Sequence, residues 1–515
     1  MADIEPSTSP PSEKQAVSQT AHDRSASPVA IGRMSTESAA AAKKILEHSG
    51  DHDEAMKAFA NGEVVEVDAA TNKRLLRRID KFMMPLMCVV YGLNYLDKTT
   101  LSYASIMGLR EDINLVGDNY QWLGGMFYFG YLAWEWPTNL LLQRLPLAKY
   151  SALNVILWGS MLVLHAAVGN FAGAVAVRLL LGVFESAVTP GFALLTSQWW
   201  TRSEQGYRTC IWFSFNGWGQ IFGGLIAYAI DVGARRHGSA IAPWKTVFMV
   251  NGLITVALGI AFYWIIPDNQ LNARWLSDRD RVLAVARVRS NQQGIGNKHF
   301  KRYQFIEALK DPMTWAFVFY SLVADIPNGG MSNFFSQLIV SFGYTPSQSL
   351  LYGTPGGAVE VVALLVCGYL GDRYGQRILW SMAGLSVGIL GFILIVALPL
   401  DIKTGRLIGF YLTLAVPCPF VALLSLISSN IAGYTKKTTV AALYLIAYCV
   451  GNIIGPQTFR PADAPHYRPA QITILACYGA CMIDLVFIWW YYRRQNQRKT
   501  ALRAAPGYTK VENQE

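Results

Sequence analysis

The stretch from Gly173 to Trp200 reads GAVAVRLLLGVFESAVTPGFALLTSQWW. It is longer than the roughly 20 apolar residues that a helix needs to cross the hydrocarbon core of a bilayer, so it predicts a transmembrane helix. The stretch nevertheless carries two charges, Arg178 and Glu185. A charge at the bilayer centre costs at least about 2.5–3.5 kcal/mol, so we expect both side chains to face protein or a wet cavity and not lipid.

Arg178 and Glu185 are separated by two helical turns, so they lie on one face of the helix and about 10 Å apart along its axis. Gly182 lies on the same face between them and has no side chain to fill the space. We therefore expect this face to form a polar wall of a transport path. The alternative is a structural ion pair that locks two helices together.

The composition of the whole chain excludes an ordinary soluble protein. Of its 515 residues, 52% are hydrophobic and 15% are charged, and the mean hydropathy is positive. These values are typical of a protein that crosses a membrane several times. The net charge of +10 does not indicate a nucleic-acid partner, because lysine and arginine concentrate in the connectors beside the apolar runs.

No motif predicts a cofactor, a metal site or an enzymatic reaction. The seven cysteines lie in or at the ends of apolar segments, without a CxxC pair, and the chain has no GxSxG, Walker or HExxH pattern. The expected partners are the lipid bilayer and a small transported solute. We expect the chain to act as a monomer.

Hydrophobic runs follow one another along the chain twelve times. They cover residues 82–106, 121–142, 150–169, 173–195, 208–231, 244–266, 313–341, 350–370, 378–399, 407–429, 439–457 and 470–492. An even number of spans places both termini on one side of the membrane. The basic group that precedes the first run, within NKRLLRRIDKFMMP, predicts that this side is the cytosol. The expected location is the plasma membrane.

These runs divide the chain into five parts. We expect a disordered cytosolic tail at 1–72, a six-helix half at 73–266, a cytosolic linker at 267–312, a second six-helix half at 313–492 and a cytosolic tail at 493–515. Within the linker, NARWLSDRDRVLAVARVR predicts one or two surface helices without a site of their own.

The segments that follow the second span of each half are similar in sequence. The second half reads GYLGDRYGQR from Gly368 to Arg377, where the first half reads NLLLQRLPLAK. The pattern GxxxDRxGxR resembles the signature loop of the major facilitator superfamily, which implies an all-α polytopic fold with two parallel repeats around a central cavity. The resemblance makes Asp372, Arg373 and Arg377 gating residues, with Arg144 as their counterpart in the first half.

Four longer stretches resemble the fungal allantoate permease family of anion–cation symporters. They are YGLNYLDKTTLSYASIMGL, RLLLGVFESAVTPGF, PNGGMSNFFSQLIVSFGY and NIAGYTKKTTVAALYLIAYCVGNIIGPQ. The resemblance implies proton-coupled import of a small organic anion such as allantoate, ureidosuccinate, nicotinate or pantothenate. Many members read LDRxN in the first span, where this chain has Asp97, Lys98, Thr99 and Thr100. The cation is kept, but the bidentate guanidinium is lost.

Asp97 and Lys98 are adjacent, so they point about 100° apart around the first helix and cannot both face the same way. We assign Lys98, together with Arg178, to the anion. Asp97 and Glu185 are assigned to the proton, because a carboxylate near Arg178 and water can exchange its charge for a bound proton. The alternative for Lys98 is an ammonium that only neutralises Asp97.

The second half supplies uncharged recognition groups. Pro327 and the glycine pair after it should weaken the seventh span and expose backbone groups toward the cavity, which makes Asn328 and Asn333 substrate candidates. A gate hinge without ligand contact is the alternative. Tyr448 and Asn452 lie one turn apart on one face of the eleventh span. They either line the cavity or pack against a neighbouring helix. Glu360 is either a second proton-coupling group or a hydrogen bond between helices.

Three classes of function remain. Proton-coupled uptake of an organic anion is the first, export of an acidic metabolite the second, and a non-transporting nutrient sensor the third. In FNGWGQIFGG of the fifth span, Gln220 stands where antiporters of the superfamily carry proline, which favours symport. The tails, of about 75 and 20 residues, are short for a signalling sensor.

Overall fold

The computed structural model describes residues 67–289, 301–431, 433–464 and 467–504, and every regular element in these ranges is a helix. The first half contains the spans α3 (Ala69–Ser105), α5 (Asn119–Arg144), α6 (Leu147–His165), α7 (Phe171–Glu185) with α8 (Val188–Trp199), α9 (Arg202–His237) and α10 (Pro243–Ile265). The short α4 (Leu109–Asp112) follows α3. Residues 1–66 of the predicted tail at 1–72 lie outside the described residues, and its last residues belong to α3, which begins at Ala69.

The second half repeats this order. It contains α13 (Pro312–Ser341), α14 (Pro346–Tyr352) with α15 (Thr354–Tyr374), α16 (Arg377–Ala397), α17 (Lys403–Thr413) with α18 (Cys418–Asn430), α19 (Tyr434–Gln457), the 3-10 turn η1 (Pro461–Asp463) and α20 (Arg468–Ala504). Each of the twelve predicted runs coincides with one helix or one broken helix of the described chain. The predicted all-α polytopic fold is confirmed.

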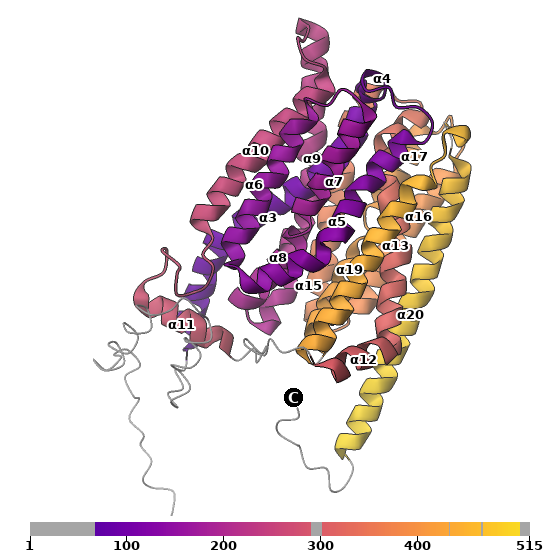
Figure 1. Cartoon of the computed structure of the whole chain (residues 1–515). Coiled ribbons are helices and arrows are strands. Elements are labelled where there is room, and N and C mark those ends of the chain that lie inside the picture. Colours follow the sequence, from indigo (N-terminus) through magenta and orange to yellow (C-terminus); the bar gives the residue numbers. More distant parts are fainter. Residues whose placement is uncertain (1–66, 290–300, 432, 465–466, 505–515) are drawn as a thin grey trace, which may run out of the picture.

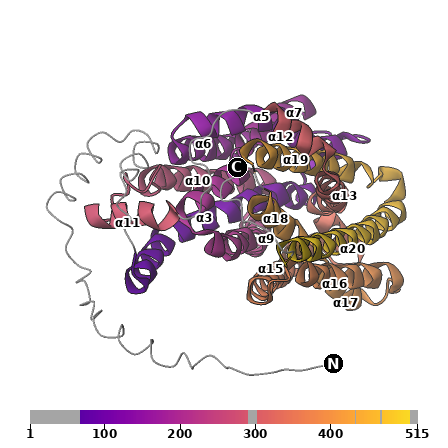
Figure 2. The ribbon, with the colours of Figure 1, turned by 90° about the horizontal axis from the view of Figure 1, so that it is seen from below.

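Two linker helices join the halves, α11 (Asp278–Arg289) and α12 (Arg302–Lys310). Figure 1 shows the halves side by side, with α11 and α12 at one end of the bundle and α4 at the other. We call these ends the linker side and the far side. In Figure 2, seen from the linker side, α11 lies beside the first half. It is held there by an ion pair between Asp280 and Arg74 of α3, at 2.6 Å.

The same helix pairs pack in both halves. In the first half α3 packs on α9, α6 on α10 and α5 on α7; in the second half α13 packs on α19, α16 on α20 and α15 on α17 and α18. These are equivalent pairs in chain order, as a parallel repeat requires. The halves meet along α3, α5 and α9 on one side and α13, α15 and α19 on the other.

Eight helical segments of the described chain are long and apolar enough to cross a membrane by length and composition. The four spans outside this set are α3, α5, α9 and α13, and all four lie at the interface between the halves. Helices hidden from lipid tolerate polar residues, so the loss of apolar character marks the polar interior of the protein.

Glycines of the first half admit neighbouring backbone. A Cβ added at Gly182 of α7 would collide with the carbonyl oxygen of Phe127 on α5, and one at Gly130 of α5 would collide with that of Leu179 on α7. The α7 face at Gly182 is therefore filled by α5. The expectation of open space there is wrong, because close helix contact, typical of glycine in membranes, replaces the missing side chain.

Gly182→Ala should destabilise the protein strongly, since the new methyl group meets main chain that cannot rotate away. Overpacking alone costs about 1–3 kcal/mol. Thermal unfolding of detergent-solubilised protein, followed by fluorescence-detected gel filtration, measures the effect. The control is Gly479→Ala on α20, where nothing lies within 4 Å of the added atom. It should unfold at or slightly above the wild-type temperature, and an equal loss in both variants would contradict the packing argument.

Candidate functional site

Three polar residues of the first half, Asn94, Lys98 and Glu185, bond to one another in a cluster. Lys98 Nζ lies 3.1 Å from Glu185 Oε1, and Asn94 Nδ2 donates to the same oxygen at 2.8 Å. Lys98 also donates to Asn94 Oδ1 at 3.1 Å. Asn94 and Lys98 are one turn apart on α3, which brings both to Glu185 at the end of α7. Sequence reasoning missed Asn94, although its spacing from Lys98 indicates a shared face.

This cluster is partly open. Glu185 is fully buried, whereas 15% of the Lys98 side chain is exposed. Glu185 Oε2 has no hydrogen-bond partner among the described residues. Lys98 therefore holds the carboxylate of a fully buried acid while part of its own side chain stays exposed.

Asp97 points away from Lys98 into the body of the first half. It is fully buried, and neither of its carboxylate oxygens has a hydrogen-bond partner in the described part of the chain. Lys98 therefore pairs with Glu185 and not with Asp97. The alternative in which Lys98 only neutralises Asp97 is wrong, because the rotation of α3 turns the two adjacent side chains toward different helices.

Arg178 lies on the buried face of α7 that also carries Glu185, as predicted. Its guanidinium lies over the ring of Phe248 on α10, 5.9 Å from the centroid, and its Nε and Nη2 have no hydrogen-bond partner among the described residues. Asp97 and Glu185 are close enough to interact with it electrostatically. Of Asp97, Lys98, Arg178 and Glu185, only Lys98 and Glu185 are thus in direct contact.

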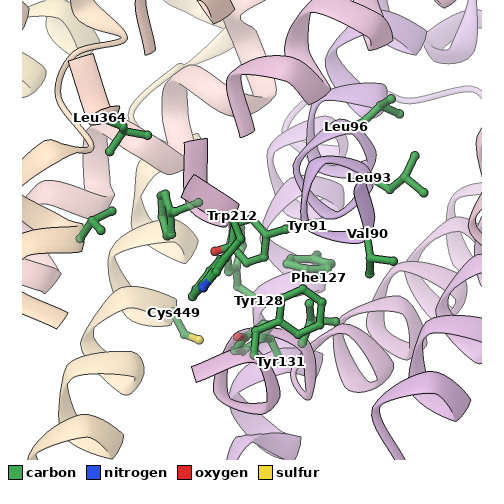
Figure 3. Packing of buried hydrophobic residues seen from close by; sticks show 14 of the residues in the cluster. Val90, Tyr91, Leu93, Leu96, Phe127, Tyr128, Tyr131, Trp212, Leu364 and Cys449 are labelled. Carbon is green, nitrogen blue, oxygen red and sulfur yellow. The ribbon is translucent and has the colours of Figure 1, made fainter. Parts of the chain in front are cut away.

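Aromatic rings connect this cluster to the second half. Lys98 Nζ lies 5.7 Å from the centre of the Phe127 ring on α5. Two further rings of α5 face Tyr448 of α19: Tyr128, the residue after Phe127, at 5.8 Å and Tyr131, one turn after Phe127, at 6.2 Å. Figure 3 shows Phe127, Tyr128 and Tyr131 gathered between the halves. Composition alone gave no reason to separate these rings from ordinary packing.

Across the rings lies a polar cluster of the second half. Asn328 Nδ2 donates to Asn452 Oδ1 at 3.0 Å, and Asn452 Nδ2 donates to Asp325 Oδ1 at 3.2 Å. Asn452 is fully buried, whereas Asn328 is half-buried. Tyr128 lies in electrostatic range of both Lys98 and Asp325. The structure thus brings Asn328, Tyr448 and Asn452 to the interior beside the Lys98 cluster.

The expected weakening of the seventh span is absent, since α13 continues through Pro327 without a break in its described residues. A Cβ on Gly329 would lie 2.7 Å from the Asn452 backbone, and one on Gly330 would lie 2.6 Å from the Phe459 ring. The paired glycines therefore allow α19 and the turn after it to pack closely against α13. The prediction that they expose backbone toward a cavity is wrong, because close packing removes that space.

Asn333 lies apart, in a seal on the far side. Its carbonyl oxygen accepts from Tyr120 Oη at 2.6 Å, while its side chain donates to Gly329 O at 2.8 Å. Further bonds between the halves join Arg110 to Gln337 at 3.1 Å and Gln121 to Phe459 O at 3.0 Å. The halves are therefore held together on the far side, and Asn333 belongs to that contact.

On the linker side, the predicted gating loop is partly ordered by its own charges. Arg377 Nη2 lies 2.7 Å from Asp372 Oδ1, and Arg377 Nη1 donates to Ser425 Oγ at 2.9 Å. A Cβ on Gly206 of α9 would lie 2.9 Å from Arg377 Nη2, so this pair touches the first half. Arg144 and Arg373 are exposed.

Two groups lie along the contact between α9 and the second half. Gln220 Nε2 donates to Gly353 O at 2.9 Å, at the joint between α14 and α15. Glu360 of α15 is buried beside Asn216 of α9. Neither group contacts Lys98 or Glu185 through a hydrogen bond within the described chain.

The sequence is similar to those of known transport proteins. The Major Facilitator Superfamily profile matches residues 87–456. An uncharacterized transporter of Schizosaccharomyces pombe is 43% identical over 441 residues, 85% of each chain. Allantoate permease of Saccharomyces cerevisiae is 38% identical over 477 residues, which cover 90% of this chain and 87% of the permease.

A solved structure gives the same fold. A bacterial homologue of the human lysosomal transporter Spinster, in an inward-facing and occupied conformation, aligns with a TM-score of 0.56 at 16% identity, over 81% of this chain and 97% of the other. At this identity the likeness concerns the fold alone.

Proposed function

Because the chain belongs to the major facilitator superfamily and is a transporter, we propose that it carries a small organic anion into the cell together with protons. The observation that carries the proposal is the Lys98–Glu185 pair, which joins α7 to α3, a helix at the contact between the halves, and in which part of the Lys98 side chain is exposed. Buried charges inside a membrane protein mark substrate and ion pathways. The relative named allantoate permease supports a carboxylate as the cargo.

The pair provides a charge-balanced cycle. When Glu185 takes up a proton, it releases the Lys98 ammonium, which then pairs with the carboxylate of the entering anion while Asn94 holds the neutral acid. The site carries no net charge before or after loading, because one proton and one negative charge enter together. Once the site opens to the other side, the anion leaves and the proton follows, and the Lys98–Glu185 pair re-forms. An ion pair that exchanges partners in this way avoids a bare charge in the membrane.

Asp97 and Arg178 adjust this exchange from behind the pair. Arg178 compensates Asp97 in the interior of the first half and attracts the anion at longer range. Interacting acids bind protons as a unit, so Asp97 and Glu185 share one exchangeable proton. Asn328, Tyr448 and Asn452 offer hydrogen bonds to the rest of the anion. Glu360 lies beside Asn216 of α9, so we assign it to the hydrogen bond between helices.

Uptake measurements on cells that lack their own carriers test the function. Radiolabelled allantoate, ureidosuccinate, nicotinate and pantothenate are supplied at external pH 5 and pH 7 to cells with and without the protein. We expect at least one anion to accumulate against its gradient at the lower pH, and to lose this accumulation when a protonophore is added. Lower accumulation than in control cells would favour export, and no change for any anion would contradict the proposal.

The proposed uptake requires the linker side to face the cytosol and the protein to reach the plasma membrane. The basic residues before the first span and beside the linker-side connectors support this orientation. A protease added to intact cells should therefore leave a tag at either terminus intact and cut it only after permeabilisation. A tag inserted after Gly238, on the far side, is the positive control and should be cut in intact cells. Cleavage of a terminal tag in intact cells would reverse the orientation.

A further inference from the structure

Asp325 is a buried carboxylate that the cycle above does not use. It lies near the middle of α13, and 4% of its surface is exposed. Its hydrogen-bond donors are neutral: Asn452 Nδ2 at 3.2 Å and Ser321 Oγ at 3.5 Å. Among the described side chains, no lysine, arginine or histidine nitrogen lies within the 4.0 Å of an ion pair.

The surroundings of Asp325 differ from those of Asp97 and Glu185. Lys98 and Arg178 accompany Asp97 and Glu185 in the first half. The groups that interact with Asp325 from α13, α19, α20 and α5 are phenols and thiols, which are neutral at physiological pH. They are Tyr320, Tyr444, Tyr448, Cys449, Cys481 and Tyr128. The charged group within electrostatic range is Lys98, which Glu185 already holds.

An uncompensated carboxylate at this depth is costly. Moving such a charge from water to the bilayer centre is unfavourable, and neutral hydrogen bonds offset only part of this cost. The group must therefore be accompanied by a proton or a bound cation. Asn452 and Asn328 can accept or donate, so they accommodate either form of the acid by rotating their amides.

We propose that Asp325 binds a second proton, which travels with every anion. The site lies beside the aromatic rings that separate it from Lys98, so a movement that opens the interior to one side of the membrane opens both groups. The inference rests on the proposed function. It adds that transport moves charge: the Lys98–Glu185 exchange is neutral, and the proton on Asp325 brings one further positive charge inward with each monovalent anion.

Simultaneous measurement of current and flux tests this. Oocytes that express the full chain are voltage-clamped and supplied with radiolabelled allantoate, a monovalent anion, at external pH 5. We expect an inward current of about one net positive charge per allantoate taken up. Asp325→Asn keeps the size and the hydrogen bonds of the side chain, so it should retain allantoate uptake while the current falls to near zero.

Asp484→Asn is the matched control. Asp484 is a buried acid of α20 with 9% exposed surface, outside both polar clusters, and its variant should keep the wild-type ratio of charge to flux. Uptake by the wild type without current would overturn the inference even if Asp325→Asn failed to fold. So would a current that needs external sodium, or an unchanged ratio in Asp325→Asn. If no anion is taken up at any pH, the proposed function itself fails.

Discussion

Lys98→Ala should weaken the apparent affinity for the anion so far that uptake no longer saturates at concentrations that saturate the wild type. Lys98 is the cation of the central cluster, and its loss removes a charge-assisted hydrogen bond worth about 1.5–3 kcal/mol. The apparent affinity should therefore fall by about tenfold to a hundredfold. Lys98→Arg should keep part of the uptake, because the charge remains and only the geometry changes. Concentration dependence of uptake, normalised to the amount of protein at the surface, measures both variants.

The control for this substitution is Lys245→Ala at the far-side end of α10. Lys245 lies 5.2 Å from the Trp244 ring centroid, away from the central cluster, and its loss should leave the affinity unchanged. An unchanged apparent affinity in Lys98→Ala, with normal surface abundance, would refute the assignment and move the anion site to Arg178.

Glu185→Gln should separate coupling from binding. Glutamine keeps the size of the side chain and its hydrogen bonds to Asn94 and Lys98, but it fixes the neutral state. The variant should bind the anion and exchange internal for external substrate, whereas uphill uptake driven by a pH gradient should vanish. Counterflow and pH-driven uptake are measured on the same cells, together with surface abundance. Asp97→Asn should behave similarly if the two acids share their proton.

A purely structural pair predicts a different outcome. Removing one partner of a buried ion pair costs about 3–5 kcal/mol, so Glu185→Gln would then be lost from the membrane. The matched control is Glu135→Gln on α5, another buried glutamate, whose Oε1 accepts from Asn139 at 2.9 Å. It should transport normally. Normal pH-driven accumulation by Glu185→Gln would remove Glu185 from the mechanism.

The helices could be predicted from the sequence because the bilayer imposes one requirement on every span, a long apolar run. The shared face of Arg178 and Glu185 also followed from the helical period alone. The ion-pair partner of Lys98 could not be predicted in this way. The rotation of α3 decides whether Asp97 or Lys98 meets Glu185, and that rotation depends on packing between helices that are distant in the sequence.

Glycines were interpreted wrongly from the sequence at two places, and for the same reason. Gly182 and the pair Gly329 and Gly330 looked like empty space or weakness in a helix, and each admits the main chain or ring of another span. A sequence shows that a side chain is missing but not what occupies its place. Asp325 was visible as a polar residue in an apolar run, yet its isolation from any cation became apparent only from its neighbours in space.

The seal on the far side determines which interactions must break when the two halves separate there during transport. Among the side chains that the structure describes, no ion pair joins the first half to the second. The contacts across the seal are hydrogen bonds and rings, each contributing on the order of 1 kcal/mol. The energy needed to separate the halves is thus the sum of many weak, short-range interactions. In the proposed cycle the charge exchange between Lys98 and Glu185 takes place within the first half, so substitutions at different places would alter the motion and the charge exchange.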